Sequence, residues 1–358
     1  MMQNAPLSKK NFINSIDSMS EVDTIKLKNN VNKIIKAYKK YKKKKYNQII
    51  NSQYTNENIT TDIGSPGIEY IGSKNSLGYK EGFGIQKMRD GSKFRGIFTN
   101  DKVNGWGIYE HKDGDIYRGE YENDRTSGYG EYTHGNGAVY YGYWTDDMQF
   151  GIGYEIWSDS SKYSGQYNKG KKEGIGTYLW QDQTMYRGEW KSNNIQGFGI
   201  YNYVDGREYS GEWKNNQMHG YGEFTWAEGK KYVGFYKNDK KDGFGIYYWP
   251  NNRFFVGFWR EGKQNGVGKY IKGESIKYGI WKDWKREKWL DNEDEFANCL
   301  DPRDEKYVSI FQLNRNQLKK YILLDNYEDE CDNYSNFNRS IRSVKRHKKD
   351  EDDNEDDW

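Results

Sequence analysis

Aromatic and glycine residues alternate along the middle of the chain with a constant period. Gly-x-Gly pairs begin at Gly82, Gly105, Gly128, Gly151, Gly174, Gly197, Gly220, Gly243 and Gly266, each 23 residues after the one before. An aromatic-x-Gly-x-aromatic pattern lies between successive pairs, for example from Tyr117 to Tyr121. Self-similarity at a fixed period of this size indicates a repeat architecture, in which one small unit stacks on the next.

The spacing within one period predicts β-strands. Tyr117, Gly119 and Tyr121 are two residues apart, so they share one face of a strand. Asp113-Gly114 favours a two-residue type I′ turn between two such strands. A loop of about six residues, Thr99–Asn104, is expected at the other end of each unit. Each period is therefore one β-hairpin. The residues that define the repeat include Tyr117, Gly119, Tyr121, Gly128, Gly130, Tyr140, Gly142, Trp144, Tyr186, Gly188, Trp190, Tyr209, Gly211 and Trp213.

The glycines predict close packing of rings on the backbone. A glycine inside a strand weakens it unless something must approach closely, and here it stands between two aromatics on the same face. The opposite face carries the middle residue of each Gly-x-Gly, such as Trp106 and Phe198. Both faces are thus partly apolar, which favours a partner on one of them. Ser160, Gln183 and Asn252 replace the turn glycine, so looser hairpins are expected there.

The pattern Y-x-G-x-W-x(6)-G-x-G-x(5)-D-G-x-x-Y resembles the MORN (membrane occupation and recognition nexus) repeat. The resemblance covers residues 70–281 and implies a mainly β fold, an elongated antiparallel sheet of about nine 23-residue hairpins. It implies a scaffold or docking surface, because similar arrays occur in radial spoke heads, basal bodies and the cortical cytoskeleton. It also implies a second possibility, a membrane-associated module. Atypical first and last units suit the ends of such an array.

A strongly basic amphipathic helix is expected over residues 18–50, after a disordered segment at 1–17. Ser18-x-x-Glu21 can form a capping box at its start. Within it, Ile35-Lys36 and the lysines that follow resemble a degenerate IQ motif. The candidate binding residues are Leu27, Val31, Ile35, Lys36, Tyr38, Lys40 and Lys45. Three interpretations stay open: a calmodulin-like partner, an acidic surface such as an anionic membrane or tubulin, or a solvated helix.

The segments around the array differ from it in composition. Residues 51–69 are polar and are interpreted as a linker. Residues 282–324 are expected to cap the sheet edge, which would otherwise pair with other strands, and to include a second helix over 304–324. Residues 325–358 form a charged tail, in which a basic run precedes seven acids among residues 350–357. Blocks of like charge are typical of solvated tails.

Composition narrows the class of protein. Hydrophobic residues make up 34% of the chain and half of them are aromatic, which suits a thin aromatic array better than a large aliphatic core. The net charge is only +3, and two cysteines argue against a disulfide framework. The sequence has no apolar run long enough for a transmembrane helix. Its first residues include no apolar h-region, so no secretory signal is expected. We therefore expect a cytoplasmic protein of the cytoskeleton or cilium.

The sequence contains no recognisable catalytic, cofactor or metal motif. Four histidines, His111, His134, His219 and His347, do not have metal-ligand spacing. The Gly-x-Gly pairs lack the third glycine and the strand-to-helix junction of a dinucleotide-binding loop. The array carries both acidic and basic residues and no basic stripe, which disfavours binding of nucleic acid. The favoured hypothesis is a non-enzymatic scaffold that docks proteins through exposed aromatics such as Trp190 and Trp213. A regulatory subunit with calcium input through the basic helix is a further alternative.

Overall fold

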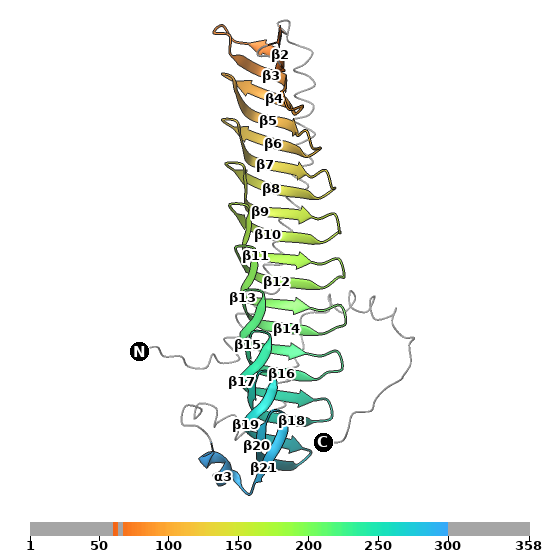
Figure 1. Cartoon of the computed structure of the whole chain (residues 1–358), viewed down its shortest axis with the longest axis vertical. Coiled ribbons are helices and arrows are strands. Elements are labelled where there is room, and N and C mark those ends of the chain that lie inside the picture. Colours follow the sequence, from red (N-terminus) through yellow and green to blue (C-terminus); the bar gives the residue numbers. More distant parts are fainter. Residues whose placement is uncertain (1–59, 64–66, 300–358) are drawn as a thin grey trace, which may run out of the picture.

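The computed structural model describes residues 60–63 and 67–299. Within them, 21 strands form one open antiparallel sheet, in which every strand pairs with the next along the chain. The strands are stacked like rungs along the long axis of the molecule (Figure 1). The predicted helices at 18–50 and 304–324, and the segments 1–17 and 325–358, lie outside the described residues.

Eighteen of the strands are seven to ten residues long, and the three at the ends of the sheet, the first, second and last, are four to six residues long. They are β1 (Thr60–Ile63), β2 (Glu69–Lys74), β3 (Lys80–Lys87), β4 (Lys93–Thr99), β5 (Lys102–Glu110), β6 (Ile116–Glu122), β7 (Arg125–Thr133), β8 (Val139–Thr145), β9 (Met148–Ile156), β10 (Lys162–Asn168), β11 (Lys171–Leu179), β12 (Met185–Lys191), β13 (Asn194–Asn202), β14 (Glu208–Lys214), β15 (Gln217–Thr225), β16 (Lys231–Lys237), β17 (Lys240–Trp249), β18 (Arg253–Arg260), β19 (Lys263–Lys272), β20 (Ser275–Lys282) and β21 (Lys285–Leu290). The sheet is thus longer than the predicted array of 70–281, because β1 lies in the segment interpreted as a linker and β21 in the capping segment.

The turns alternate between two types, and their assignment corrects the sequence prediction. The predicted six-residue loop is a two-residue type I′ turn, since Thr99 pairs with Lys102 and both Asn100 and Asp101 have positive φ. The Asp113-Gly114 turn is wider: His111 N donates to Asp115 O, and of the Asp-Gly pair only Gly114 has positive φ. This is a three-residue loop with a terminal left-handed residue. Asn and Asp tolerate left-handed geometry, which explains their place in the tight turns.

Each repeat bends at a β-bulge that the Gly-x-Gly pair creates. Between β12 and β13, Gly188 pairs with Gly199 and Trp190 pairs with Ile195, so β13 has two extra residues. Gly197 lies in this stretch at φ 67°, a conformation that side chains disfavour. Glu189 Oε1 accepts the bulge N–H of Phe198 at 2.8 Å, so the recurring glutamate has a structural role. A bulge bends its strand, and the same shift of register recurs in the neighbouring repeats.

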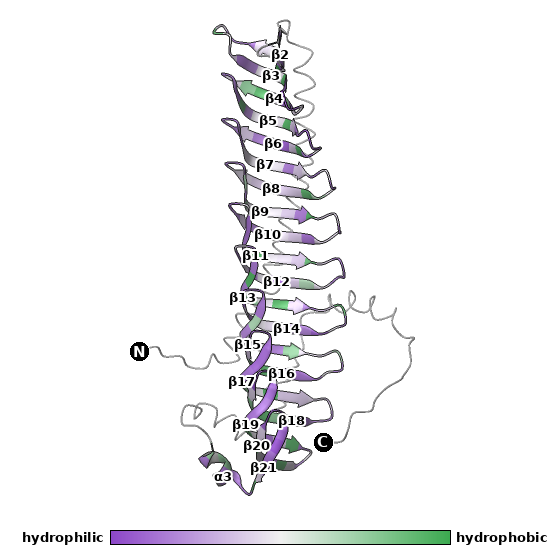
Figure 2. Ribbon diagram, in the orientation of Figure 1, coloured by the Kyte–Doolittle hydropathy of each residue, from purple (hydrophilic) through white to green (hydrophobic). Residues whose placement is uncertain are grey.

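The core is a ladder of tyrosines lying on glycines. A Cβ on Gly199 would stand 2.3 Å from Tyr186 Oη, so the ring lies directly over the bare backbone. Tyr186 is fully buried, and its hydroxyl donates to Glu189 O at 3.0 Å. The same arrangement recurs in the other repeats. The first aromatics of the central repeats are Tyr117, Tyr140, Tyr163, Tyr186, Tyr209 and Tyr232, all 0–2% exposed. Tyrosine and tryptophan score low on hydropathy scales, and Figure 2 accordingly shows hydrophobic colour only in scattered patches.

A second apolar cluster covers the opposite face at the end of the array. It is formed by Val233, Phe244, Ile246, Phe254, Val256, Ile271, Leu290 and Phe296, among others. Phe296 belongs to the short helix α3 (Glu293–Asn298) and lies 4.8 Å from the ring of Tyr278 on β20. The capping segment therefore contributes one strand and one helical turn to this end of the sheet.

We predict that Gln183→Gly stabilises the protein. Gln183 has φ 72° at the last position of its three-residue loop, where Gly206 stands in the next repeat at φ 90°. The loop is therefore strained where the sequence suggested a looser one. A left-handed non-glycine residue costs about 1–2 kcal/mol, and the extra freedom of glycine in the unfolded chain offsets part of the gain. Thermal unfolding should show a rise in Tm, whereas Gly206→Gln should lower it. A fall in Tm for Gln183→Gly would contradict this interpretation.

Candidate docking trough

Trp190 and Trp213, the second aromatics of their repeats, are part of the core, which corrects the prediction that they are exposed. They are 7% and 5% exposed, respectively. Trp213 packs edge-to-face on Tyr209 and Tyr186, at 5.1 and 5.6 Å between ring centroids. Its Nε1 donates to Gly199 O at 3.2 Å. These two side chains therefore cannot be a docking surface, because the Tyr ladder covers them.

A stripe of half-exposed rings lies beside this ladder. Its members, on or just after the strands from β9 to β19, are Trp157, Tyr178, Trp180, Tyr201, Tyr203, Trp226, Tyr247, Trp249 and Tyr270. Neighbouring rings lie close together: Trp180 lies 5.3 Å from Tyr201, which lies 4.6 Å from Tyr203. The buried Phe224 connects Tyr203 to Trp226, at 5.9 and 4.5 Å between ring centroids. These rings are not among the residues predicted from the sequence to bind a partner, although their regular spacing after each Gly-x-Gly pair was a visible signal.

The face that carries the stripe is concave. Lys172 and Tyr178 are both on β11, where six residues of flat strand would span about 20 Å. The Nζ of Lys172 nevertheless lies only 5.8 Å from the Tyr178 ring centroid. Lys241 and Tyr247 on β17 show the same curvature, because the Nζ of Lys241 lies 4.5 Å from the Tyr247 ring centroid. We call this concave face, with its half-exposed stripe, the aromatic trough.

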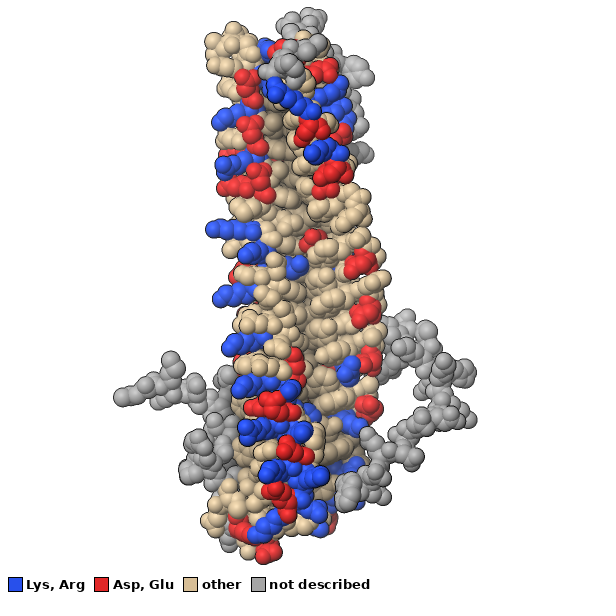
Figure 3. All heavy atoms as spheres, viewed as in Figure 1, with Lys and Arg blue, Asp and Glu red and all other residues tan. Residues whose placement is uncertain are grey.

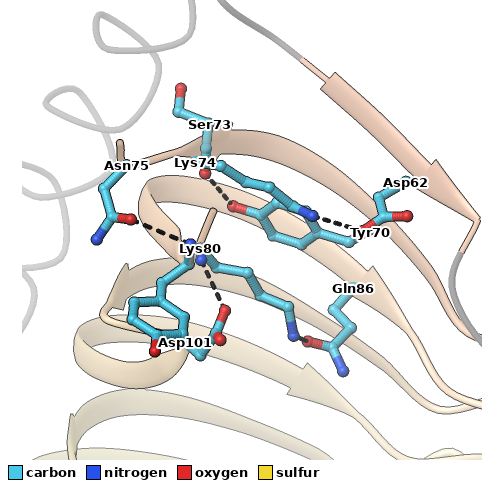
Figure 4. Close-up of polar contacts among 9 residues, drawn as sticks. Asp62, Tyr70, Ser73, Lys74, Asn75, Lys80, Gln86 and Asp101 are labelled. Carbon is cyan, nitrogen blue, oxygen red and sulfur yellow. Dashed lines mark hydrogen bonds and ion pairs between the residues drawn. The ribbon is translucent and has the colours of Figure 1, made fainter. Parts of the chain in front are cut away.

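Lysines of the chain itself fill parts of the trough. Lys241 Nζ lies 4.5–5.0 Å from four rings, those of Trp226, Tyr232, Tyr247 and Trp259. Lys80 lies 5.4 Å from the Tyr70 and Phe98 rings, and its Nζ donates to Gln86 Oε1 at 2.7 Å. Figure 4 shows how the Lys80 stem runs past Tyr70 towards Gln86, while its backbone N is held by Asp101. Cations over ring faces are attracted by the ring quadrupole.

We predict that Lys241 makes stability depend on pH. Burial lowers its pKa from 10.5 to about 7. Between these values the folded chain binds fewer protons than the unfolded one, so stability rises with pH. The Tm of wild type should therefore rise relative to the Tm of Lys241→Met when the pH is raised from 7 to 9. Met218 occupies the corresponding place one repeat earlier, so methionine fits. A Tm difference that is constant over this range would contradict the prediction.

The two long margins of the trough differ in charge. Exposed lysines, such as Lys191, Lys214 and Lys237, adjoin the two-residue turns, whereas Asp159, Asp182 and Asp205 lie in the wider loops. Hydrogen bonds from Ser161 lower the pKa of Asp159, and the backbone N–H of Arg207 lowers that of Asp205. Along the middle of the molecule, Figure 3 shows basic side chains at one margin and acidic ones at the other. A chain docked in the trough would therefore lie between a basic margin and an acidic margin.

The described residues contain no group of His, Cys, Asp and Glu side chains arranged to hold a metal ion. His111 and His134 lie among the rings of Tyr109 and Tyr132, in line with the stripe.

No described helix is long and apolar enough to cross a membrane. The candidate binding residues between Leu27 and Lys45 lie outside the described residues.

The MORN repeat family model matches seven segments of the chain. They are residues 117–139, 140–162, 163–185, 186–206, 209–231, 232–252 and 255–273. No curated protein matches the sequence significantly. Among solved structures, the TCP10 domain of Danio rerio CPAP (an E1021V mutant) is similar at 8% identity and a TM-score of 0.32, covering 56% of this chain and 93% of that one. The SAS-4 TCP domain of Drosophila melanogaster, solved with a proline-rich motif of Ana2, has 11% identity and a TM-score of 0.29, covering 49% and 94%. These likenesses are too low to carry an inference about function.

Proposed function

The chain carries an array of MORN repeats, and from this premise we propose that it is a non-enzymatic scaffold whose aromatic trough docks an extended segment of a partner protein. Repeats of this family suggest a role in scaffolding or interaction. The observation that carries the proposal is the continuous stripe of half-exposed Tyr and Trp rings. Such rings are enriched where proteins bind one another, because they supply large contact area at low entropic cost.

The shape of the trough favours an extended partner. The stripe runs across successive strands, which lie about 4.8 Å apart, so each repeat advances about 9.6 Å. A polyproline II segment advances about 3.1 Å per residue and completes a turn in three residues. One turn of such a segment thus matches one repeat closely, which would bring equivalent side chains to equivalent rings.

The proposed setting is the cytoplasm, at the cytoskeleton or in a cilium. This part of the proposal rests on the resemblance of the array to those of radial spoke heads and basal bodies. Binding of the lysine-rich segment 18–50 to a calmodulin-like protein or an anionic membrane stays a prediction, because that segment lies outside the described residues.

Photo-cross-linking from defined positions tests the trough as the docking surface. A benzoylphenylalanine at Trp180 should give a discrete cross-linked partner in cells of the source organism. The matched control is the same residue at Tyr143, which is 46% exposed and lies on the opposite face, where it pairs with Phe150. Cross-linking from Tyr143 but not from Trp180 would move the docking surface to the other face and contradict the proposal.

A further inference from the structure

We propose that residues 304–324, the segment for which the sequence predicts a second helix, cover the face opposite the aromatic trough at the C-terminal end of the sheet. We call this surface the C-terminal apolar face, and it consists of Val233, Ile246, Tyr248, Phe254, Val256 and Ile271. It lies on the other side of the sheet from the proposed docking surface, so this inference does not depend on docking in the trough.

The C-terminal apolar face begins where earlier repeats carry polar side chains. Val256 stands where Ser210 does two repeats earlier, and Phe254 stands where Glu208 does. The aromatic ladder on the other side of the sheet nevertheless continues, with Phe255 in the place of the ladder tyrosines. The last repeats therefore differ from the middle ones on one face only, and that face has become apolar.

Cross-strand pairing joins these apolar side chains into one patch. Val256 pairs with Ile246 on β17, which pairs with Val233 on β16. Phe254 pairs with Ile271 on β19. Side chains directly opposed on one face of a sheet stand about 4.5–5.5 Å apart at Cβ, so the patch is continuous from β16 to β19.

The patch is buried more deeply than an equivalent side chain in the middle of the array. Phe254 and Val256 are both 0% exposed, and Ile246 is 1% exposed. Ile200, in the place of Ile246 two repeats earlier, is only half-buried. Burial also lowers the pKa of the Lys269 ammonium group on the same face. Water is thus excluded from this face, which requires an element packed on it.

The short helix α3 cannot account for this burial alone. It packs on β20 and β21 at the end of the array (Figure 1). Its six residues rise about 9 Å, whereas the strands from β16 to β21 extend over about 24 Å. Every other element in the described part of the chain is a strand of the same sheet. A further element must therefore lie on β16 to β18.

The segment after α3 has the position and the length to be this element. The described structure ends at Cys299, one residue beyond α3, whose Phe296 packs on Tyr278 at 4.8 Å between ring centroids. The chain therefore leaves α3 beside the C-terminal apolar face. A helix over residues 304–324 would be about 30 Å long, which is enough to cross from β21 to β16.

The predicted helix is apolar on one side. Tyr307, Phe311, Leu318 and Ile322 fall within about 60° of one another at 100° per residue, and Asn316 falls on the opposite side. The apolar side matches the chemistry of the patch. A short connection also gives this segment a high effective concentration at the face, which favours it over a second copy of the chain.

The first test measures whether the face is covered, with a matched pair of cysteines. Ile246→Cys and Ile200→Cys make the same substitution at the same place in two repeats. Each is introduced into the full-length chain together with Cys299→Ser and Cys331→Ser, and its labelling by a maleimide is timed. Ile246→Cys should label about tenfold more slowly or less, because a buried thiol reacts only on local opening.

Two substitutions in the segment identify the cover. Phe311→Asp puts a charge on the apolar side of the predicted helix and should raise the labelling rate of Ile246→Cys to that of Ile200→Cys. Asn316→Asp puts the same charge on the opposite side and should leave the slow rate unchanged. Labelling of Ile200→Cys should be the same in both backgrounds, which excludes general unfolding.

Photo-cross-linking distinguishes this segment from a second copy of the chain. Benzoylphenylalanine in place of Phe311 keeps an aromatic side chain there and should link to peptides of β16 to β19. In an equal mixture of isotope-labelled and unlabelled protein, no product should join a labelled peptide to an unlabelled one, because the contact is intramolecular.

Equal labelling of Ile246→Cys and Ile200→Cys, or slow labelling that persists in Phe311→Asp, would overturn the inference. Cross-links between labelled and unlabelled peptides would assign the face to a second copy instead. Cross-links from position 311 to rings of the trough would place the segment on the wrong side of the sheet. The docking proposal is decided separately, by the cross-link from Trp180.

Discussion

Gly199→Ala is expected to destabilise the protein by about 3 kcal/mol or more, although it adds a single methyl group. The new Cβ would lie 2.3 Å from Tyr186 Oη and 2.5 Å from two carbons of that ring. Tyr186 cannot move aside easily, because it is fully buried between Trp190 and Trp213 at 5.4 and 5.6 Å. The φ of Gly199 is ordinary, so the cost is steric and not conformational.

Denaturant unfolding measures this cost, and two comparisons isolate its origin. Gly206→Ala puts a methyl group at a turn with φ 90°, where the nearest atom is Ala227 Cβ at 3.5 Å. It should cost only the strain of left-handed alanine, about 1–2 kcal/mol. Removing the ring with Tyr186→Ala should make the second substitution, Gly199→Ala, much less costly than it is alone. Additive effects in this double-mutant cycle would show that the ring is not the obstacle.

Trp213→Ala is expected to cost about 3–5 kcal/mol and to disrupt the array as a single cooperative unit. The indole joins two repeats, because it contacts Tyr209 in its own repeat and Tyr186 in the preceding one. The stability of a repeat array is roughly the sum of its units and nearest-neighbour interfaces. Weakening one interface in the middle should therefore separate the unfolding of the two halves.

Thermal and denaturant unfolding should accordingly show two transitions in Trp213→Ala where wild type shows one. The control is Tyr143→Ala, which removes an exposed aromatic from the opposite face and should change stability by less than about 1 kcal/mol. A single transition with an unchanged midpoint in Trp213→Ala would mean that the indole is a surface residue, as the sequence suggested.

The sequence by itself determined the repeat and the strands. A repeat of 23 residues, within which aromatic residues and glycines occupy every second position, leaves few alternatives to stacked hairpins. The nine predicted units correspond to strands of one continuous sheet. The alternation also assigned Tyr186, Gly188 and Trp190 correctly to one face, because successive side chains of a strand point to opposite sides. The packing of rings on glycine followed from the same pattern.

The turn types were decided by the pairing register, which a local pattern does not reveal. Asp113-Gly114 is compatible with two hairpin loops, and only the pairing of β5 with β6 selects the wider one. Likewise, the bulge gives the two glycines of a pair different roles. Gly197 supplies a positive φ, whereas Gly199 makes room for Tyr186.

The exposure of the aromatics was decided by the bend of each strand, where a bulge recurs in repeat after repeat. Bending brings Trp213 under its neighbours and leaves Tyr201 and Tyr203 half exposed, although all three stand on the same face. The same bend brings the Nζ of Lys241 close to four aromatic rings. The sequence therefore determined which side chains share a face, and only the tertiary structure decided which of them a partner can reach.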